Sequence, residues 1–125
     1  MHYYGRRRKN CKVVKLKLDN HTDERGTIVW ASNKILNFNY KYLTIGTIEP
    51  GTIRAGYYHK RIFKKFLCIY GKIKLSIGNK GITLESGEIV DIPTGKVHII
   101  KNIGDKTAFF VEFKSEDYDT NDRHI

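Results

Sequence analysis

The sequence predicts an all-β fold, a sandwich or barrel built from many short strands. Short runs of alternating apolar and polar residues follow one another, separated by Gly, Asn or Asp, and almost no stretch has helical periodicity. Hydrophobic residues make up 40% and aromatic residues 12% of the 125 residues, which is enough for one core and argues against global disorder. We therefore expect one β domain.

The first half of the chain holds three expected strands. Valine and leucine at alternate positions mark 13–18, and β-branched and aromatic residues mark 27–30. A longer alternating run marks 40–48. Trp30 and Cys68 belong to residue types that favour burial, so we expect both in the core.

The remaining strands follow at short intervals. Strands at 66–70 and 72–77 flank Gly71, and the sequence Gly-Asn-Lys-Gly at 78–81 predicts a hairpin turn. The later expected strands are 82–84, 88–92, 97–101 and 107–113. Because the edges of such sheets must be covered, we expect closure or a partner chain. Outward side chains such as Tyr58 and Phe63 favour a homodimer.

The charge of the chain is compatible with an anionic partner and equally with a solvated basic surface. Lys and Arg number 23 against 13 Asp and Glu, a formal net charge of +10 with neutral histidines. Such an excess fits nucleic acid, an anionic membrane surface or a phosphorylated small molecule. The sequence contains no nucleic-acid-binding motif, so we expect no nucleic-acid partner.

The termini and cysteines bear on compartment and domain organisation. No apolar run approaches the roughly 20 residues of a membrane helix, and the basic N-terminus lacks the hydrophobic stretch of a secretory signal. Cys11 and Cys68 form no CxxC pair, which argues against a disulfide scaffold or a zinc finger. We expect a cytoplasmic protein without a membrane partner. It would have a flexible basic arm at 1–11 and one domain at 12–125.

Two stretches carry the functional signal. In 51–71, Tyr57 and His59 stand two positions apart, so on a strand both side chains point to one face. In 87–102, His98 follows a Pro-Thr-Gly segment that suits a turn at a strand end. If His98 enters the barrel, it meets His59 across a small cavity.

These stretches resemble the two signature motifs of the cupin superfamily. The second motif is matched at every position, by Gly87, Pro93, Gly95, His98 and Asn102. The first motif is matched by Gly51, His59 and Gly71. The resemblance implies the cupin double-stranded β-helix, or jelly roll, for residues 12–125.

The first motif departs from the family at two positions. In many cupins two histidines and a glutamate of the first motif hold one metal ion together with the histidine of the second. Here Tyr57 replaces the first histidine and Lys64 replaces the glutamate, so only His59 and His98 remain. The charge of Lys64 opposes cation binding. We expect no metal and no other cofactor; a divalent metal, if present, would be held by His59 and His98.

Within the cupins, the chain is similar to nucleotide-sugar isomerases and epimerases. These include sugar 3,4-ketoisomerases, dehydrorhamnose 3,5-epimerase-like proteins and the cupin domain of capsule-sugar reductases. The supporting segments are Asp-Glu-Arg-Gly at 23–26, Pro-Gly-Thr-Ile-Arg at 50–54 and Tyr-Asp-Thr-Asn-Asp at 118–122. The resemblance implies an isomerase or epimerase of deoxysugar or surface-polysaccharide biosynthesis. Its substrate would be a 4-keto-6-deoxy sugar linked to thymidine or uridine diphosphate.

Both reactions remove a proton next to a ketone and pass through an enediol or enediolate. Histidine suits the base, which makes His59 and His98 the candidates. Tyr57 could return a proton, and Lys64 could stabilise the oxyanion without a metal. The expected substrate-binding residues are Arg54, Lys60 and Arg25 for the diphosphate and Tyr40 and Tyr42 for stacking on the base or sugar.

Two other functions stay open at this point. The replaced histidine and glutamate are compatible with a non-catalytic cupin that binds a sugar or nucleotide-sugar. A metal-dependent small-molecule cupin enzyme, such as a dioxygenase, is the other alternative. Metal content separates this last function from the other two, and proton exchange into the sugar separates the enzyme from the binding protein.

Overall fold

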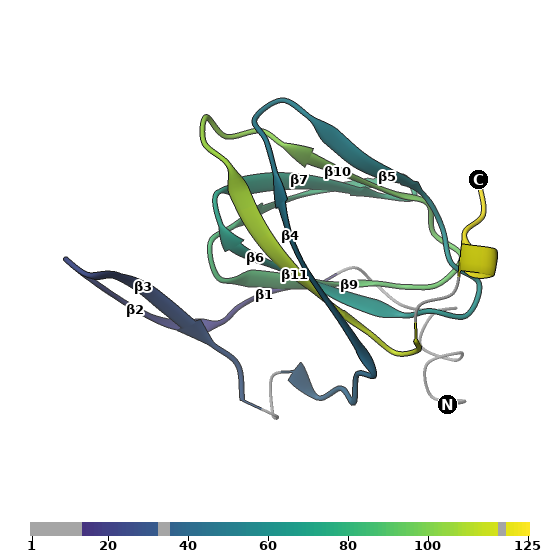
Figure 1. Ribbon diagram of the computed structural model, residues 1–125, viewed down its shortest axis with the longest axis horizontal. Coiled ribbons are helices and arrows are strands. Elements are labelled where there is room, and N and C mark those ends of the chain that lie inside the picture. The colour runs from purple at the N-terminus through teal and green to yellow at the C-terminus, as the bar shows by residue number, and fades with distance from the viewer. Residues whose placement is uncertain (1–13, 33–35, 118–119) are drawn as a thin grey trace.

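Two antiparallel sheets face each other in the computed structural model, which describes residues 14–32, 36–117 and 120–125 (Figure 1). The five-stranded sheet has the order β1(Lys15–Lys17), β9(Glu88–Ile92), β6(Lys64–Tyr70), β11(Ala108–Lys114) and β4(Tyr42–Ile48). The four-stranded sheet has the order β5(Ile53–Tyr57), β10(His98–Asn102), β7(Lys72–Ile77) and β8(Lys80–Glu85). The expected all-β cupin jelly roll is confirmed.

A separate hairpin and a short C-terminal helix complete the described chain. The hairpin consists of β2(Asp19–Asp23) and β3(Gly26–Trp30), and it projects from the body of the two sheets (Figure 1). The 3-10 helix η1(Thr120–Asp122) lies at the other end of the molecule, near the C-terminus (Figure 1).

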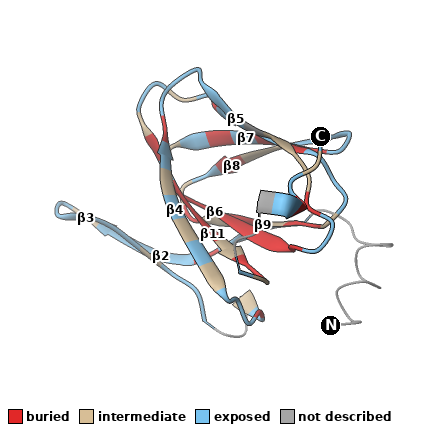
Figure 2. Cartoon of the chain, turned by 45° about the vertical axis from the view of Figure 1, so that its right-hand side comes forward, coloured by how far each residue is buried: buried red, intermediate tan, exposed pale blue. Residues whose placement is uncertain are grey.

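The main core fills the space between the two sheets (Figure 2). Strand β7 shows why the sequence folds this way, because Ile73, Leu75 and Ile77 are buried while Lys72 and Lys74 are exposed. This alternation places one face of the strand on the core and the other in water. Each strand that contributes to the core brings its apolar face by the same period of two.

A second apolar layer lies on the outer face of the five-stranded sheet. Leu18, at the entry to the hairpin, packs there with Leu67 of β6 and Val111 of β11. The N-terminal part of the chain therefore covers part of a sheet face that would otherwise be exposed to water.

Two sequence expectations about individual side chains are wrong. Phe63 is not outward-facing, because it is buried and packs edge-on against Phe38 with the ring centroids 5.4 Å apart. Trp30 is 48% exposed, since it lies on the projecting hairpin, whereas Cys68 is buried as expected.

Three motif residues have structural roles that position the site. Gly71 has φ of 103°, and a Cβ there would lie 2.9 Å from the Ala108 Cβ, so only glycine fits. The Asn102 amide is fully buried and donates to the Ile48 and Lys106 carbonyls, each at 2.8 Å. The Gly95 amide donates to the His59 carbonyl at 2.7 Å, which ties the second motif to the first.

The expected arm at 1–11 lies outside the described residues, and the division at residue 12 stays a prediction. In the described part of the chain, no helix has the length and apolar character needed to cross a membrane. The cytoplasmic location likewise stays a prediction.

Candidate active site

An open cavity of about 410 Å³ lies between the sheets, where β4 and β11 of one sheet face β5 and β10 of the other. Its lining residues are Thr44, Ile53, Arg54, Tyr57, Ile100, Phe110, Glu112, Lys114 and Arg123. Three of these side chains carry a positive charge and one a negative charge. The cavity therefore suits an anionic ligand of small-molecule size.

The four expected catalytic residues lie together at this cavity. The Tyr57 ring has its centroid 5.1 Å from the ring centroids of both His59 and His98. His59 and His98 are buried, with 6% and 1% exposure, and their own centroids are 6.3 Å apart. Lys64 is also buried, and its Nζ lies 5.3 Å from the Tyr57 ring centroid. Of the four, only Tyr57 lines the cavity itself.

Lys64 is the centre of a buried polar network. Its Nζ lies 3.1 Å from His98 Nε2 and 3.4 Å from a carboxylate oxygen of Glu112. The other Glu112 oxygen lies 3.5 Å from Lys114 Nζ. Burial lowers the pKa of Lys64 to about 8, and the Glu112 carboxylate opposes this shift. Lys64 is therefore a cation at pH 7 that can give up its proton at little cost.

The hydrogen bond of His59 fixes its tautomer. His59 Nδ1 lies 2.8 Å from the backbone carbonyl oxygen of Asp122, and a carbonyl can only accept, so Nδ1 carries the hydrogen. His59 Nε2 then holds a lone pair, and this buried atom has no hydrogen-bond partner among the described residues. His98 Nε2 correspondingly accepts from the Lys64 ammonium.

Both histidines are neutral at pH 7. Burial, followed by the charge of Lys64, lowers the pKa of His59 to about 4 and that of His98 to about 3. A neutral imidazole with such a pKa is a weak base. Negative charge that develops on a bound ligand would stabilise the protonated ring and strengthen it as a base.

The residues present do not fit a divalent metal ion. The Lys64 ammonium lies 3.1 Å from His98 Nε2, and this positive charge opposes a cation at that nitrogen. Within 14–32, 36–117 and 120–125, no group of three or more His, Cys, Asp or Glu side chains could hold a metal. The expectation of a metal-free site stays a prediction.

The five expected substrate-binding residues lie in different places relative to the cavity. Arg54 lines the cavity, and Tyr42 lies under Lys114, whose Nζ is 5.2 Å from the Tyr42 ring centroid. Tyr40 is 45% exposed and packs against Phe113 outside the cavity.

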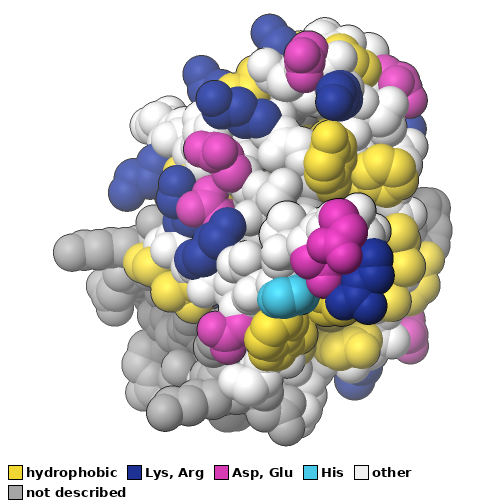
Figure 3. All heavy atoms as spheres, turned by 90° about the vertical axis from the view of Figure 1, so that its left-hand side faces the viewer, with side chains coloured by type: hydrophobic (Ala, Val, Ile, Leu, Met, Phe, Trp, Pro, Cys, Tyr) yellow, Lys and Arg dark blue, Asp and Glu magenta, His cyan; other side chains and the backbone are white. Residues whose placement is uncertain are grey.

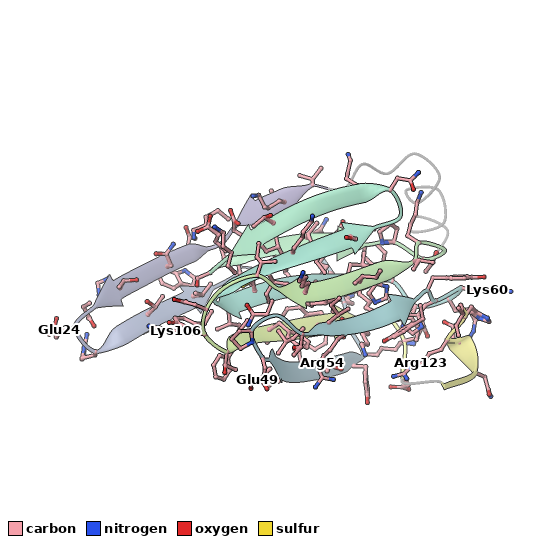
Figure 4. The ribbon with its side chains drawn as sticks, turned by 90° about the horizontal axis from the view of Figure 1, so that it is seen from above. Glu24, Glu49, Arg54, Lys60, Lys106 and Arg123 are labelled. Atoms are coloured by element: carbon pink, nitrogen blue, oxygen red, sulfur yellow. The ribbon has the colours of Figure 1, made fainter. Side chains whose placement is uncertain are left out.

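The structure does not bring Arg25 or Lys60 to the cavity of this chain. Arg25 is at the turn of the hairpin, where its guanidinium lies 2.6 Å from the Asp23 carboxylate. Lys60 is exposed and points outward at one end of the molecule (Figure 4).

Sequence reasoning missed four residues of the site. Glu112 and Lys114 follow Phe110 at intervals of two on β11, so strand alternation alone could have placed all three on one face. Asp122 closes the Tyr-Asp-Thr-Asn-Asp segment at 118–122 that carries part of the family resemblance, but no periodic signal places it or Arg123 in the site. They reach the site because η1 folds back against the loop after β5.

Comparison with solved structures supports the fold. A 3,4-ketoisomerase from Helicobacter canadensis has a TM-score of 0.75 at 19% identity, covering 89% of this chain and 88% of that chain. The TDP-quinovose 3,4-ketoisomerase from Campylobacter jejuni has the same score and identity, with 91% and 92% covered. A dTDP-6-deoxy-D-glucose-3,5-epimerase from Legionella pneumophila, in complex with dTDP-4-keto-L-rhamnose, has 0.74 at 14% identity, with 89% and 70% covered. These likenesses establish the cupin fold.

Sequence comparisons place the chain in a family. The comparison with curated protein sequences gives no match. The model of the polysaccharide biosynthesis C-terminal domain matches residues 21–124, which is most of the chain and includes both cupin motifs. The chain belongs to the polysaccharide biosynthesis C-terminal domain family.

Proposed function

We propose that this protein is an isomerase or epimerase that acts on a nucleotide-linked 4-keto-6-deoxy sugar in deoxysugar or surface-polysaccharide biosynthesis. One observation carries the proposal. A tyrosine and two neutral histidines, Tyr57, His59 and His98, cluster beside a buried lysine at the wall of a cationic cavity. These are the groups that proton transfer next to a ketone requires.

The cavity fits the ligand class in charge and size. Arg54, Lys114 and Arg123 could neutralise a diphosphate, and about 410 Å³ is within the usual range for small-molecule sites. Similar solved structures point the same way, because a 3,4-ketoisomerase from Thermoanaerobacterium thermosaccharolyticum was crystallised with TDP. A thymidine or uridine diphosphate sugar is therefore the proposed partner.

The mechanism follows from the tautomers. His59 Nε2 has the free lone pair, so it takes the proton from the carbon beside the ketone. The electron pair of that C–H bond forms a carbon–carbon double bond, and the π pair of the ketone moves to its oxygen. The Tyr57 hydroxyl donates to this oxygen, while the Lys64 charge stabilises it from behind the ring. Return of a proton to the opposite face of the same carbon inverts that carbon. For ketoisomerization, the former carbonyl oxygen keeps a proton, the neighbouring hydroxyl loses its proton to become the new carbonyl, and a proton is added to the former carbonyl carbon.

A binding protein without catalysis is the second candidate. The observation that favours it is the burial of both histidines beside the cavity, with Tyr57 between them and the open space. In that case Arg54, Lys114 and Arg123 would bind the nucleotide-sugar, and the two histidines would only pack in the protein interior.

Proton exchange tests the proposal against this alternative. The protein is incubated in heavy water with thymidine-diphosphate 4-keto-6-deoxyglucose, and the sugar is examined by NMR. Deuterium next to the ketone is expected for the enzyme. Clear binding without deuterium would support the binding protein, and stoichiometric iron or zinc in the purified protein would revive the metal-dependent alternative.

Tyr57→Phe is expected to lower turnover at least about tenfold, the scale of one hydrogen bond to a developing charge. The ring remains, so its contacts with both histidines and the melting temperature should persist. Tyr70→Phe is the matched control, because Tyr70 is 46% exposed on the outer surface. Wild-type turnover by Tyr57→Phe would remove Tyr57 from the chemistry.

We also propose a homodimer. Exposed hydrophobic side chains gather between charged ones on the side from which the hairpin projects (Figure 3). Large exposed apolar residues on the hairpin and on the outer face of β4 and β11 are Ile28, Trp30, Leu43, Ile45 and Phe109. Strand β4 is also an edge of its sheet, which favours a covering partner.

Ile45→Lys is expected to convert the dimer to a monomer at micromolar concentration, because it puts a charge into the proposed interface. Sedimentation velocity measures the change. Ile99→Lys, at an exposed position of the opposite sheet, is the control and should remain dimeric. A wild-type protein that sediments as a monomer at high concentration would contradict the proposed dimer.

A further inference from the structure

The C-terminal segment 120–125 packs against the chain that follows β5. Tyr58 and His124 pair through two backbone hydrogen bonds, of 2.9 Å and 3.0 Å. The same segment supplies the carbonyl of Asp122 that holds His59. The C-terminal segment is thus held in place by the rest of the structure, and it lies next to the cavity.

Asp122 is the anchor of this segment. Its side chain is buried, and its carboxylate accepts hydrogen bonds from the backbone amides of Lys60 at 3.0 Å, Arg61 at 3.0 Å and Ile62 at 3.2 Å. Burial alone would raise the pKa of this carboxyl, but the hydrogen bonds from the Arg61 and Lys60 amides, together with the positive charges of Arg61 and of protonated His59, outweigh burial and lower it. Asp122 is therefore ionised at neutral pH, and its carboxylate fixes the C-terminal segment 120–125 to the loop at 60–62.

Arg123 is the next residue, so the anchor determines where its backbone lies. Its guanidinium carbon is 4.9 Å from the Tyr57 ring centroid, and its side chain lines the cavity together with Arg54 and Lys114. Figure 4 shows Arg54 and Arg123 neighbouring each other along one side of the molecule. The C-terminal segment thus adds a third positive charge to the cavity lining, beside Arg54 and Lys114 of the strands.

We propose that Arg123 binds the diphosphate of the ligand and that Asp122 positions it. The inference rests on the proposed function and assigns a ligand contact to the C-terminal tail. Arginine suits this role, because its planar donors match two phosphate oxygens at once and its charge never titrates near neutral pH. Arg123 is exposed at the cavity, so a ligand can reach it without displacing the buried Lys64–Glu112 pair.

The first test measures the affinity for thymidine diphosphate by calorimetry. Arg123→Gln is expected to weaken binding about tenfold or more, the scale of one charge-assisted contact. Arg123→Lys keeps the positive charge but lacks the paired donors of the guanidinium, so its affinity should lie between those of Arg123→Gln and the wild type. Lys106→Gln, an exposed lysine in the loop after β10, is the control and should bind like the wild type (Figure 4).

The second test asks whether Asp122 acts through Arg123. Asp122→Asn should weaken thymidine diphosphate binding, because the amide lacks the charge that holds the three backbone donors. In the double variant with Arg123→Gln, the losses in binding free energy should not add. If Asp122 acts only by positioning Arg123, its substitution has no further effect once the arginine is gone. Fully additive losses would show that Asp122 does not position Arg123.

The outcomes separate this inference from the proposed function. Wild-type protein that binds neither thymidine diphosphate nor uridine diphosphate would overturn both. Wild-type binding that Arg123→Gln leaves unchanged would overturn the inference alone. An unchanged melting temperature for Arg123→Gln, with recovery by Arg123→Lys, would support a ligand contact over a purely structural role.

Discussion

Replacement of His59 by Asn is expected to lower turnover of a nucleotide-linked 4-keto sugar by about 10²-fold or more, the usual scale for loss of a general base. Asparagine cannot take a proton at neutral pH. Its amide can still donate to the Asp122 carbonyl, which His59 Nδ1 now contacts at 2.8 Å, so the local geometry should survive. Thymidine diphosphate should bind almost as before, since Arg54, Lys114 and Arg123 line the cavity and His59 does not.

A second histidine supplies the control for this experiment. His21 lies on the projecting hairpin with its side chain 60% exposed, so His21→Asn should turn over substrate like the wild type. The decisive readout is deuterium uptake next to the ketone, because it reports proton removal even when product release is slow. Wild-type exchange by His59→Asn would make His59 a core residue and leave the base unassigned.

Much of the fold was predictable because its motifs encode backbone requirements. Gly71 is needed where the backbone approaches Ala108, and Asn102 is needed to hold the buried carbonyls of Ile48 and Lys106. The spacing of the motif residues therefore predicts the jelly roll. Strand alternation found most of the other strands. It missed β2, whose residues 19–23 are all polar, and β5 at 53–57, where a glycine interrupts the pattern.

The candidate site was predictable only where the motifs reach it. Tyr57, His59, His98 and Lys64 cluster because each occupies a motif position that faces the barrel interior. The placement of Arg25 could not be predicted, because the hairpin that carries it projects from the sheets instead of folding over them.

The contacts of the C-terminal segment could not be predicted from the sequence either. The buried carboxylate of Asp122 accepts from three amides at residues 60–62, across 60 to 62 positions of sequence. The Tyr-Asp-Thr-Asn-Asp segment marks Asp122 as part of the family resemblance, but it does not show what Asp122 contacts. Only the fold of the tail shows that Asp122 and Arg123 belong to the site.

The wild-type protein is expected to lose several kcal/mol of unfolding free energy as the pH falls from 6.5 to 4. His59 and His98 have pKa values of about 4 and about 3 in the fold, against 6.5 in an unfolded chain. In this window the unfolded state binds more protons than the folded state, so acid favours unfolding. Lys64 stays charged throughout the window, because its pKa is about 8, and it keeps opposing protonation of both rings.

The share of His59 can be isolated by substitution. A drop of its pKa from 6.5 to about 4 corresponds to about 3 kcal/mol, which is present at pH 7 and lost as the pH falls to 4. Urea unfolding at pH 7, 6 and 5 should therefore show a steep fall for the wild type and a shallower one for His59→Asn, which lacks this titration. Since a small domain has only about 5–15 kcal/mol in total, the wild type should approach unfolding near pH 4. Equal slopes for the two proteins would mean that His59 is not held neutral by burial, and its role as a lone-pair base would go with it.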